Sequence, residues 1–150
     1  MKEYTCERLY RDARILSIYE GTSQMQVVAA IKGVANGSFL KRIAELDAMP
    51  VGAGFEDVRE KLVSMTEKYK ELVSMASAET QKPGAYDFLA RKLVESAGCL
   101  IMGYLLLQDA SRNARFGKSC RVFVNMASAE IAGNAGFIKN FDDVYLTKQD

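Results

Sequence analysis

Apolar residues between positions 55 and 76 recur at alternating spacings of three and four, and this pattern restricts the possible fold more than any other feature of the chain. The apolar positions are Phe55, Val58, Leu62, Met65, Tyr69, Leu72 and Ala76. This spacing places a single apolar stripe along an α-helix and does not fit the alternation of a β-strand. Charged residues such as Glu60 and Lys68 fill the positions between and predict a solvated opposite face. We therefore expect a long amphipathic helix here.

Turn residues divide the chain into a few further segments, at residues 36–38, 49–54, 82–84 and 117–118. The segment from about Tyr86 to 110–115 is apolar on every side in its middle, which predicts a place at the centre of a bundle or between the bundle and another protein. A further helix is expected from about Lys118 to Ile138, and its many small residues favour close helix approach. No credible strand is seen. The sequence predicts an all-α fold, an antiparallel four-helix-type bundle in which residues 38–48 are either the first member or a connector.

Composition excludes several classes of function. Twenty basic and 19 acidic residues nearly cancel, so neither nucleic acid nor an anionic membrane is an expected partner. Histidine is absent, which excludes Ser-His-Asp catalysis and histidine-based metal sites, and no bound metal is expected. The three cysteines Cys6, Cys99 and Cys120 are predicted to be buried thiols in a reducing compartment. The longest apolar run, residues 97–107, is too short for a membrane span, and no signal peptide is evident, so we expect a cytoplasmic location.

Glu20 stands in the most specific stretch of the chain, residues 8–24. The stretch is predicted to comprise the end of one helix, a short apolar segment, and then a carboxylate, a glycine and a hydroxyl residue that open another helix. A turn at a helix start can direct Glu20 into a cleft beside free backbone N–H groups, and apolar neighbours that exclude water favour proton abstraction. In the alternative interpretation, Glu20 only interacts favourably with the helix dipole and Thr22 only caps the helix.

Residues 11–15, Arg-Asp-Ala-Arg-Ile, followed by residues 18–24, Ile-Tyr-Glu-Gly-Thr-Ser-Gln, resemble the C-terminal signature of the acyl-CoA dehydrogenases. These flavoenzymes introduce a trans double bond between the α and β carbons of an acyl thioester. The resemblance implies that Glu20 is the base that takes the α proton while the β hydrogen leaves as hydride to FAD. Glu20 also favours the short- or medium-chain type.

The same resemblance implies roles for four neighbours of this glutamate. Tyr19 would line the acyl pocket and Gly21 would touch the acyl-CoA substrate, whereas Thr22 and Gln24 would contact the flavin nucleotide. The segment departs from the family pattern further on, because valines follow Gln26 where many members carry an arginine near the CoA nucleotide.

The resemblance also implies a division of the chain and a set of partners. Residues 1–37 would be the terminal helices and catalytic loop of the dehydrogenase C-terminal domain, residues 38–54 a short helix and linker, and residues 55–150 an additional helical bundle like that of larger bacterial members. The expected function is that of a C-terminal fragment of an FAD-dependent enzyme of fatty acid metabolism, which is inert alone. Its expected partners are an electron-transfer flavoprotein as electron acceptor and further copies of itself in a homo-oligomer. The alternative is a helical oligomerisation or interaction module with no catalytic role.

Overall fold

The computed structural model describes residues 5–15, 23–78 and 84–146, and this part of the chain is helical with no strand. The elements in chain order are α1 (Thr5–Ile15), α2 (Ser23–Ala35), α3 (Ser38–Asp47), α4 (Glu56–Ala78), α5 (Ala85–Arg112), the 3-10 turn η2 (Ala114–Phe116), α6 (Gly117–Lys139) and the 3-10 turn η3 (Asp143–Leu146). The predicted all-α class is confirmed, and helices end near the turn residues that the sequence marked.

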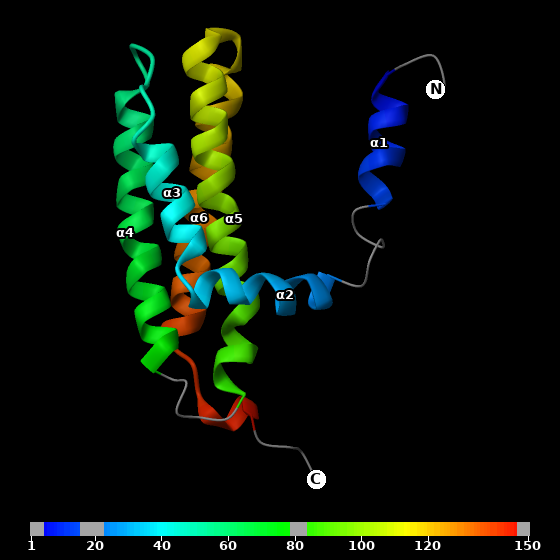
Figure 1. Cartoon of the computed structure of the whole chain (residues 1–150), viewed down its shortest axis with the longest axis vertical. Coiled ribbons are helices and arrows are strands. Elements are labelled where there is room, and N and C mark those ends of the chain that lie inside the picture. Colours follow the sequence, from blue (N-terminus) through cyan, green and yellow to red (C-terminus); the bar gives the residue numbers. More distant parts are fainter. Residues whose placement is uncertain (1–4, 16–22, 79–83, 147–150) are drawn as a thin grey trace.

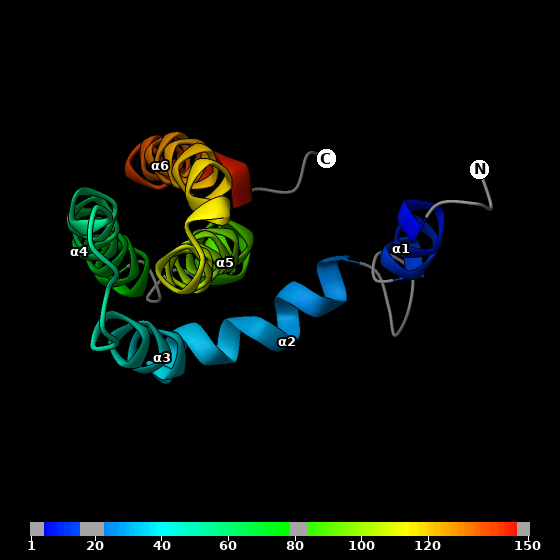
Figure 2. The same ribbon diagram turned by 90° about the horizontal axis from the view of Figure 1, so that it is seen from above.

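Helices α3 to α6 form the bundle and run along its long axis in alternating directions (Figures 1 and 2). Helix α5 is central, because it packs against α2, α3, α4 and α6. Helix α2 lies across the long axis and leads past α5 towards α1, which lies beyond the far end of α2. The predicted division at residues 37 and 54 stays a prediction, although α2 contacts the bundle directly.

The stripe predicted on α4 is the bundle's inner surface. Its members from Val58 to Ala76 are buried, and Phe55 packs against the same core from the preceding linker. From α5, the residues Ala97, Leu100, Tyr104 and Leu107 complete this core with α6. The opposite side of α5 leaves Met102 and Leu105 exposed, so the segment that is apolar on every side is only partly covered by the bundle.

A glycine of α5 lies in close contact with a leucine of α4. A Cβ atom added to Gly103 would lie 2.7 Å from Leu62 Cδ2 of α4. By contrast, Gly133 and Gly136 of α6 have nothing within 4 Å of such an atom. The small residues of α6 were expected to serve close packing, and for these two glycines that expectation is wrong, because they do not face a neighbouring helix.

The linker between α3 and α4 is fastened to α6 by one arginine. Arg121 donates a hydrogen bond of 2.8 Å to the Gly54 carbonyl and pairs with both carboxylate oxygens of Asp57. Its guanidinium carbon lies 5.6 Å from the centre of the Phe55 ring, within the range of a cation–π contact. Residues far apart in sequence therefore fix the start of α4.

Helix α5 is the one described helix that is long and apolar enough to cross a membrane, and half of its apolar window is buried inside the bundle. Because a core helix has the same composition, these features are weak evidence for a membrane span.

Candidate functional site

The residues expected to carry catalysis lie almost wholly outside the described part of the chain. Tyr19, Glu20, Gly21 and Thr22 fall between α1 and α2, and Gln24 lies in the first turn of α2 with its side chain not described. Their expected roles therefore stay predictions. The structure does establish how α2, the helix that directly follows the motif, is held.

One face of α2 is part of the bundle's interior. Val27, Ile31 and Val34 are buried, and their spacing of four and three places them on one side of the helix. They belong to a second core cluster whose other buried members are Leu72, Ala76, Leu89, Ala90, Leu93 and Ile138. The helix that follows the predicted site is thus anchored to α5 and α3, and it shares this core cluster with residues of α4 and α6.

The other face of α2 is apolar and exposed. The side chain of Met25 is 60% exposed and that of Val28 is 50% exposed. The short apolar stretch from Met25 to Ala35 has no charged residue except Lys32. An apolar helix with one open side is typical of an element that packs between two bodies.

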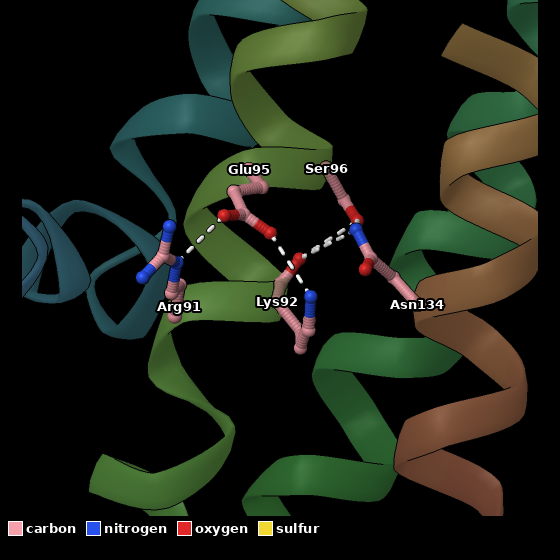
Figure 3. A network of polar contacts seen from close by, with 5 residues as sticks. All are labelled: Arg91, Lys92, Glu95, Ser96 and Asn134. Carbon is pink, nitrogen blue, oxygen red and sulfur yellow. Dashed lines mark hydrogen bonds and ion pairs between the residues drawn. The ribbon is translucent and has the colours of Figure 1, made fainter. Parts of the chain in front are cut away.

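The polar network of Figure 3 joins α5 to α6. Asn134 of α6 donates to Ser96 Oγ at 3.2 Å and to the Lys92 carbonyl at 3.5 Å. Glu95 accepts from Arg91 at 2.8 Å and from Lys92 at 3.3 Å. Burial acts to raise the pKa of Glu95, but the two hydrogen bonds outweigh it and the pKa lies below its usual value. The Glu95 carboxylate, the Lys92 carbonyl and Ser96 Oγ already have protein donors, so the network joins the two helices and offers no free base.

A second polar cluster lines a small cavity between α3, α4 and α5. The cavity has a volume of about 110 Å³ and includes Asp47, Thr66 and Tyr104 in its wall. Asp47 Oδ1 accepts from Arg59 Nε at 3.0 Å. Burial raises the pKa of Tyr104, and the nearby Asp47 carboxylate acts in the same direction. Tyr104 therefore stays protonated, and the Asp47 carboxylate is already paired with Arg59. This cluster offers no free base, and its polar wall suits a water molecule better than a reaction.

The cysteines do not supply a nucleophile in the bundle. Burial, followed by the Glu130 carboxylate, raises the pKa of the Cys99 thiol to about 11, and burial raises that of Cys120, so both remain thiols near neutral pH. Cys6 is exposed on α1, and the expectation of burial is wrong for this residue because α1 does not pack in the bundle. Within the described ranges no group of three or more metal-binding side chains occurs.

Comparison with known proteins gives two adjoining family matches. Residues 1–34 match a family described as "Acyl-CoA dehydrogenase, C-terminal domain", and residues 35–146 match one described as "Acyl-CoA dehydrogenase C terminal". The predicted resemblance to the family is thereby confirmed, whereas the roles of the motif residues are not tested.

Two relatives add to this result. The chain is 50% identical over 42 residues to the caffeyl-CoA reductase-Etf complex subunit CarC of Acetobacterium woodii, which is 28% of this chain and 10% of that protein's length. A crystal structure of an acyl-CoA dehydrogenase family protein from Porphyromonas gingivalis matches with a TM-score of 0.71 and 27% identity, over 76% of this chain and 98% of the solved one. By its family matches, this chain belongs to the acyl-CoA dehydrogenase C-terminal domain family.

Proposed function

We propose that this chain is the C-terminal part of an FAD-dependent acyl-CoA dehydrogenase that oxidises the α,β bond of acyl-CoA thioesters. The observation that carries the proposal is the junction of the two family matches at residues 34 and 35, because the segment with Glu20 lies in the first and the bundle fills the second. The chain spans 10% of the length of the curated relative that it matches. The isolated chain is therefore proposed to be inactive.

Within the proposal, Glu20 takes the α proton and its neighbours hold the reactants. Tyr19 and Gly21 contact the acyl-CoA, and Thr22 and Gln24 contact FAD, which supplies a hydride acceptor when bound. The start of α2 is compatible with such a site, since its exposed Met25 and Val28 leave this end of the helix open. A carboxylate kept from water beside a bound thioester is a suitable general base.

The name of the relative guides the choice of electron partner and substrate. That protein is a subunit of a reductase complex with Etf, which supports an electron-transfer flavoprotein as the electron partner. Its role as acceptor, a cytoplasmic location and a place in fatty acid metabolism are parts of the proposal that rest on the family resemblance. The relative's name also specifies a CoA thioester with an aryl side chain. Saturated acyl-CoAs and caffeyl-CoA are therefore both informative test ligands.

The test compares the natural enzyme-length polypeptide with its Glu20→Gln variant under anaerobic conditions. We expect butyryl-CoA or longer acyl-CoAs to bleach the flavin absorbance of the wild type and the variant to lose about 10²- to 10⁴-fold in rate. Glu7→Gln is the matched control, because Glu7 is a carboxylate on α1 that pairs with Arg11. Bound flavin that is neither bleached by acyl-CoAs nor, after reduction, reoxidised by caffeyl-CoA would contradict the dehydrogenase proposal.

A second candidate function is a helical interaction or oligomerisation module. The observation in its favour is the exposure of Val122 and Met126, which line one shallow pocket on α6 together with Phe123, because apolar side chains grouped on a surface mark interaction sites. Sedimentation of the chain at increasing concentration tests this function. We expect wild type to self-associate and Met126→Glu to remain monomeric, and a wild type that stays monomeric would refute association through this face.

A further inference from the structure

Gly33 of α2 lies in close contact with Phe39 of α3. A Cβ atom added to Gly33 would lie 3.0, 3.1 and 3.2 Å from the Cζ, Cε1 and Cε2 atoms of Phe39 on α3. These distances are shorter than ordinary carbon contacts. A Cβ atom here would require the Phe39 ring or the backbone of α2 to shift by a few tenths of an ångström.

The corner between α2 and α3 is also fixed. Gly37 has a φ of +75°, a left-handed conformation that suits glycine. Asn36 Oδ1 accepts hydrogen bonds from the backbone N–H of Ser38 at 2.9 Å and from its hydroxyl at 2.6 Å. With two residues between the helices, this corner and the contact of Gly33 with Phe39 together set the direction of α2.

Val27 and Ile31 also hold α2 on the core, and together with the contact at Gly33 they set where the start of α2 lies. Ser23, where α2 begins, lies ten residues before Gly33, or about 15 Å along the helix axis. A tilt of about 4° at Gly33 would therefore move the start of α2 by about 1 Å. A misplacement of this size in an active site lowers turnover by about 10²-fold.

We propose that the bundle positions the predicted catalytic segment through α2, and that Gly33 and Phe39 are the positioning residues. The proposal rests on the proposed function, because it assigns the bundle a role towards Glu20. Val27, Ile31 and Val34 hold α2 on the second core cluster, and the packing of Gly33 on Phe39 sets its angle. The bundle then serves the reaction without touching substrate or flavin.

The first experiment measures the angle between α2 and α5 in the chain itself. At 16.6 kDa the chain suits residual dipolar couplings of its backbone amides. Gly33→Ala should change the angle between α2 and α5, and the double variant Gly33→Ala/Phe39→Leu should restore it, because leucine lacks the ring edge. The control is Gly98→Ala, a helical position with nothing within 4 Å of an added Cβ. An unchanged angle in Gly33→Ala, or no restoration in the double variant, would overturn the proposal.

The second experiment measures catalysis in the enzyme-length polypeptide. Gly33→Ala should lower the kcat of flavin reduction by about 10- to 100-fold with KM for acyl-CoA unchanged, and the double variant should recover kcat. A purely structural defect would instead reduce flavin content or raise KM. Turnover that survives Glu20→Gln would refute the proposed function, whereas a tilted α2 with an unchanged kcat would refute the positioning role alone. Should Gly33→Ala fail to fold, Phe39→Leu alone tests the same contact, with a more variable α2 angle and a lower kcat expected.

Discussion

Gly103 of α5 lies close to α4, and Gly98 on the same helix provides a matched control. We predict that alanine at Gly103 makes the chain less stable than alanine at Gly98. Replacing a helical glycine by alanine stabilises a helix by up to about 1 kcal/mol through backbone entropy. At Gly98 the new methyl group would enter open space, so Gly98→Ala should show this gain. At Gly103 the methyl group would stand 2.7 Å from Leu62 Cδ2, about 1 Å closer than an ordinary carbon contact.

Leu62 cannot easily make room for that methyl group. Its side chain is fully buried in the first core cluster, and Val124 Cγ2 lies 3.7 Å from the added Cβ on another side. Overpacking of this kind costs about 1–3 kcal/mol. Because the entropic gain is common to both variants, Gly103→Ala should be less stable than Gly98→Ala by about 1–3 kcal/mol, which corresponds to a lower Tm by roughly 2–12 °C.

Urea unfolding followed by circular dichroism measures both variants under the same conditions. Leu62→Ala alone should lower the free energy of unfolding by about 2–5 kcal/mol, because it leaves a cavity. The double variant Gly103→Ala/Leu62→Ala provides a further check, since the methyl group at position 103 would fill part of that cavity. The two changes should therefore destabilise less together than the sum of their separate effects. Equal stability of Gly103→Ala and Gly98→Ala, or strict additivity with Leu62→Ala, would refute the packing argument.

Three further predictions concern groups in and around the bundle. The Tyr69 hydroxyl is buried with no hydrogen-bond partner among the described residues, so Tyr69→Phe should raise the free energy of unfolding by up to about 1 kcal/mol. The Tyr104 hydroxyl is hydrogen-bonded with Thr66 and Asp47, so Tyr104→Phe should lower the free energy of unfolding by about 1 kcal/mol; urea unfolding of both variants tests the pair. The pKa of Glu95 is lowered in the folded chain, so the stabilisation by this carboxylate is present above its unfolded-state pKa and is lost as pH falls. In the same assay, the free energies of unfolding of wild type and Glu95→Gln should therefore differ more at about pH 7 than at about pH 3.5. Exposed Cys6 should react with a thiol reagent in the folded chain, and Cys99 and Cys120 only on unfolding, and rapid modification of either remaining thiol in the Cys6→Ser variant would contradict this.

The sequence was sufficient to predict the helices of the bundle, since their limits depend on local signals. The stripe from Val58 to Ala76 is buried as expected, and α6 begins at Gly117 beside the predicted break. Contacts across helices were not predictable in the same way. Nothing in the local sequence distinguishes Gly103, which has no room for a methyl group, from Gly98, which has ample room, because the difference depends on which residue of α4 lies opposite.

The site was predictable only as a motif. Its residues in 16–22 lie outside the described part of the chain, and their chemistry rests on the family resemblance. The anchoring of α2 was missed, although its apolar positions Val27, Ile31 and Val34 are spaced as a helix face. The missing information was the partner surface, which is assembled from residues of α4, α5 and α6 far along the chain.

The fastening of the interhelical linker by Arg121 has a consequence for the order of folding. Its hydrogen bonds to Asp57 and Gly54 join residues 64 and 67 positions apart, so they close a large loop that contains all of α4 and α5. Such contacts form only after the entropy of loop closure has been offset by other interactions. We therefore expect Arg121 to hold the connection between α3 and α4 only after α5 and α6 have packed together, so that this connection becomes ordered late in folding.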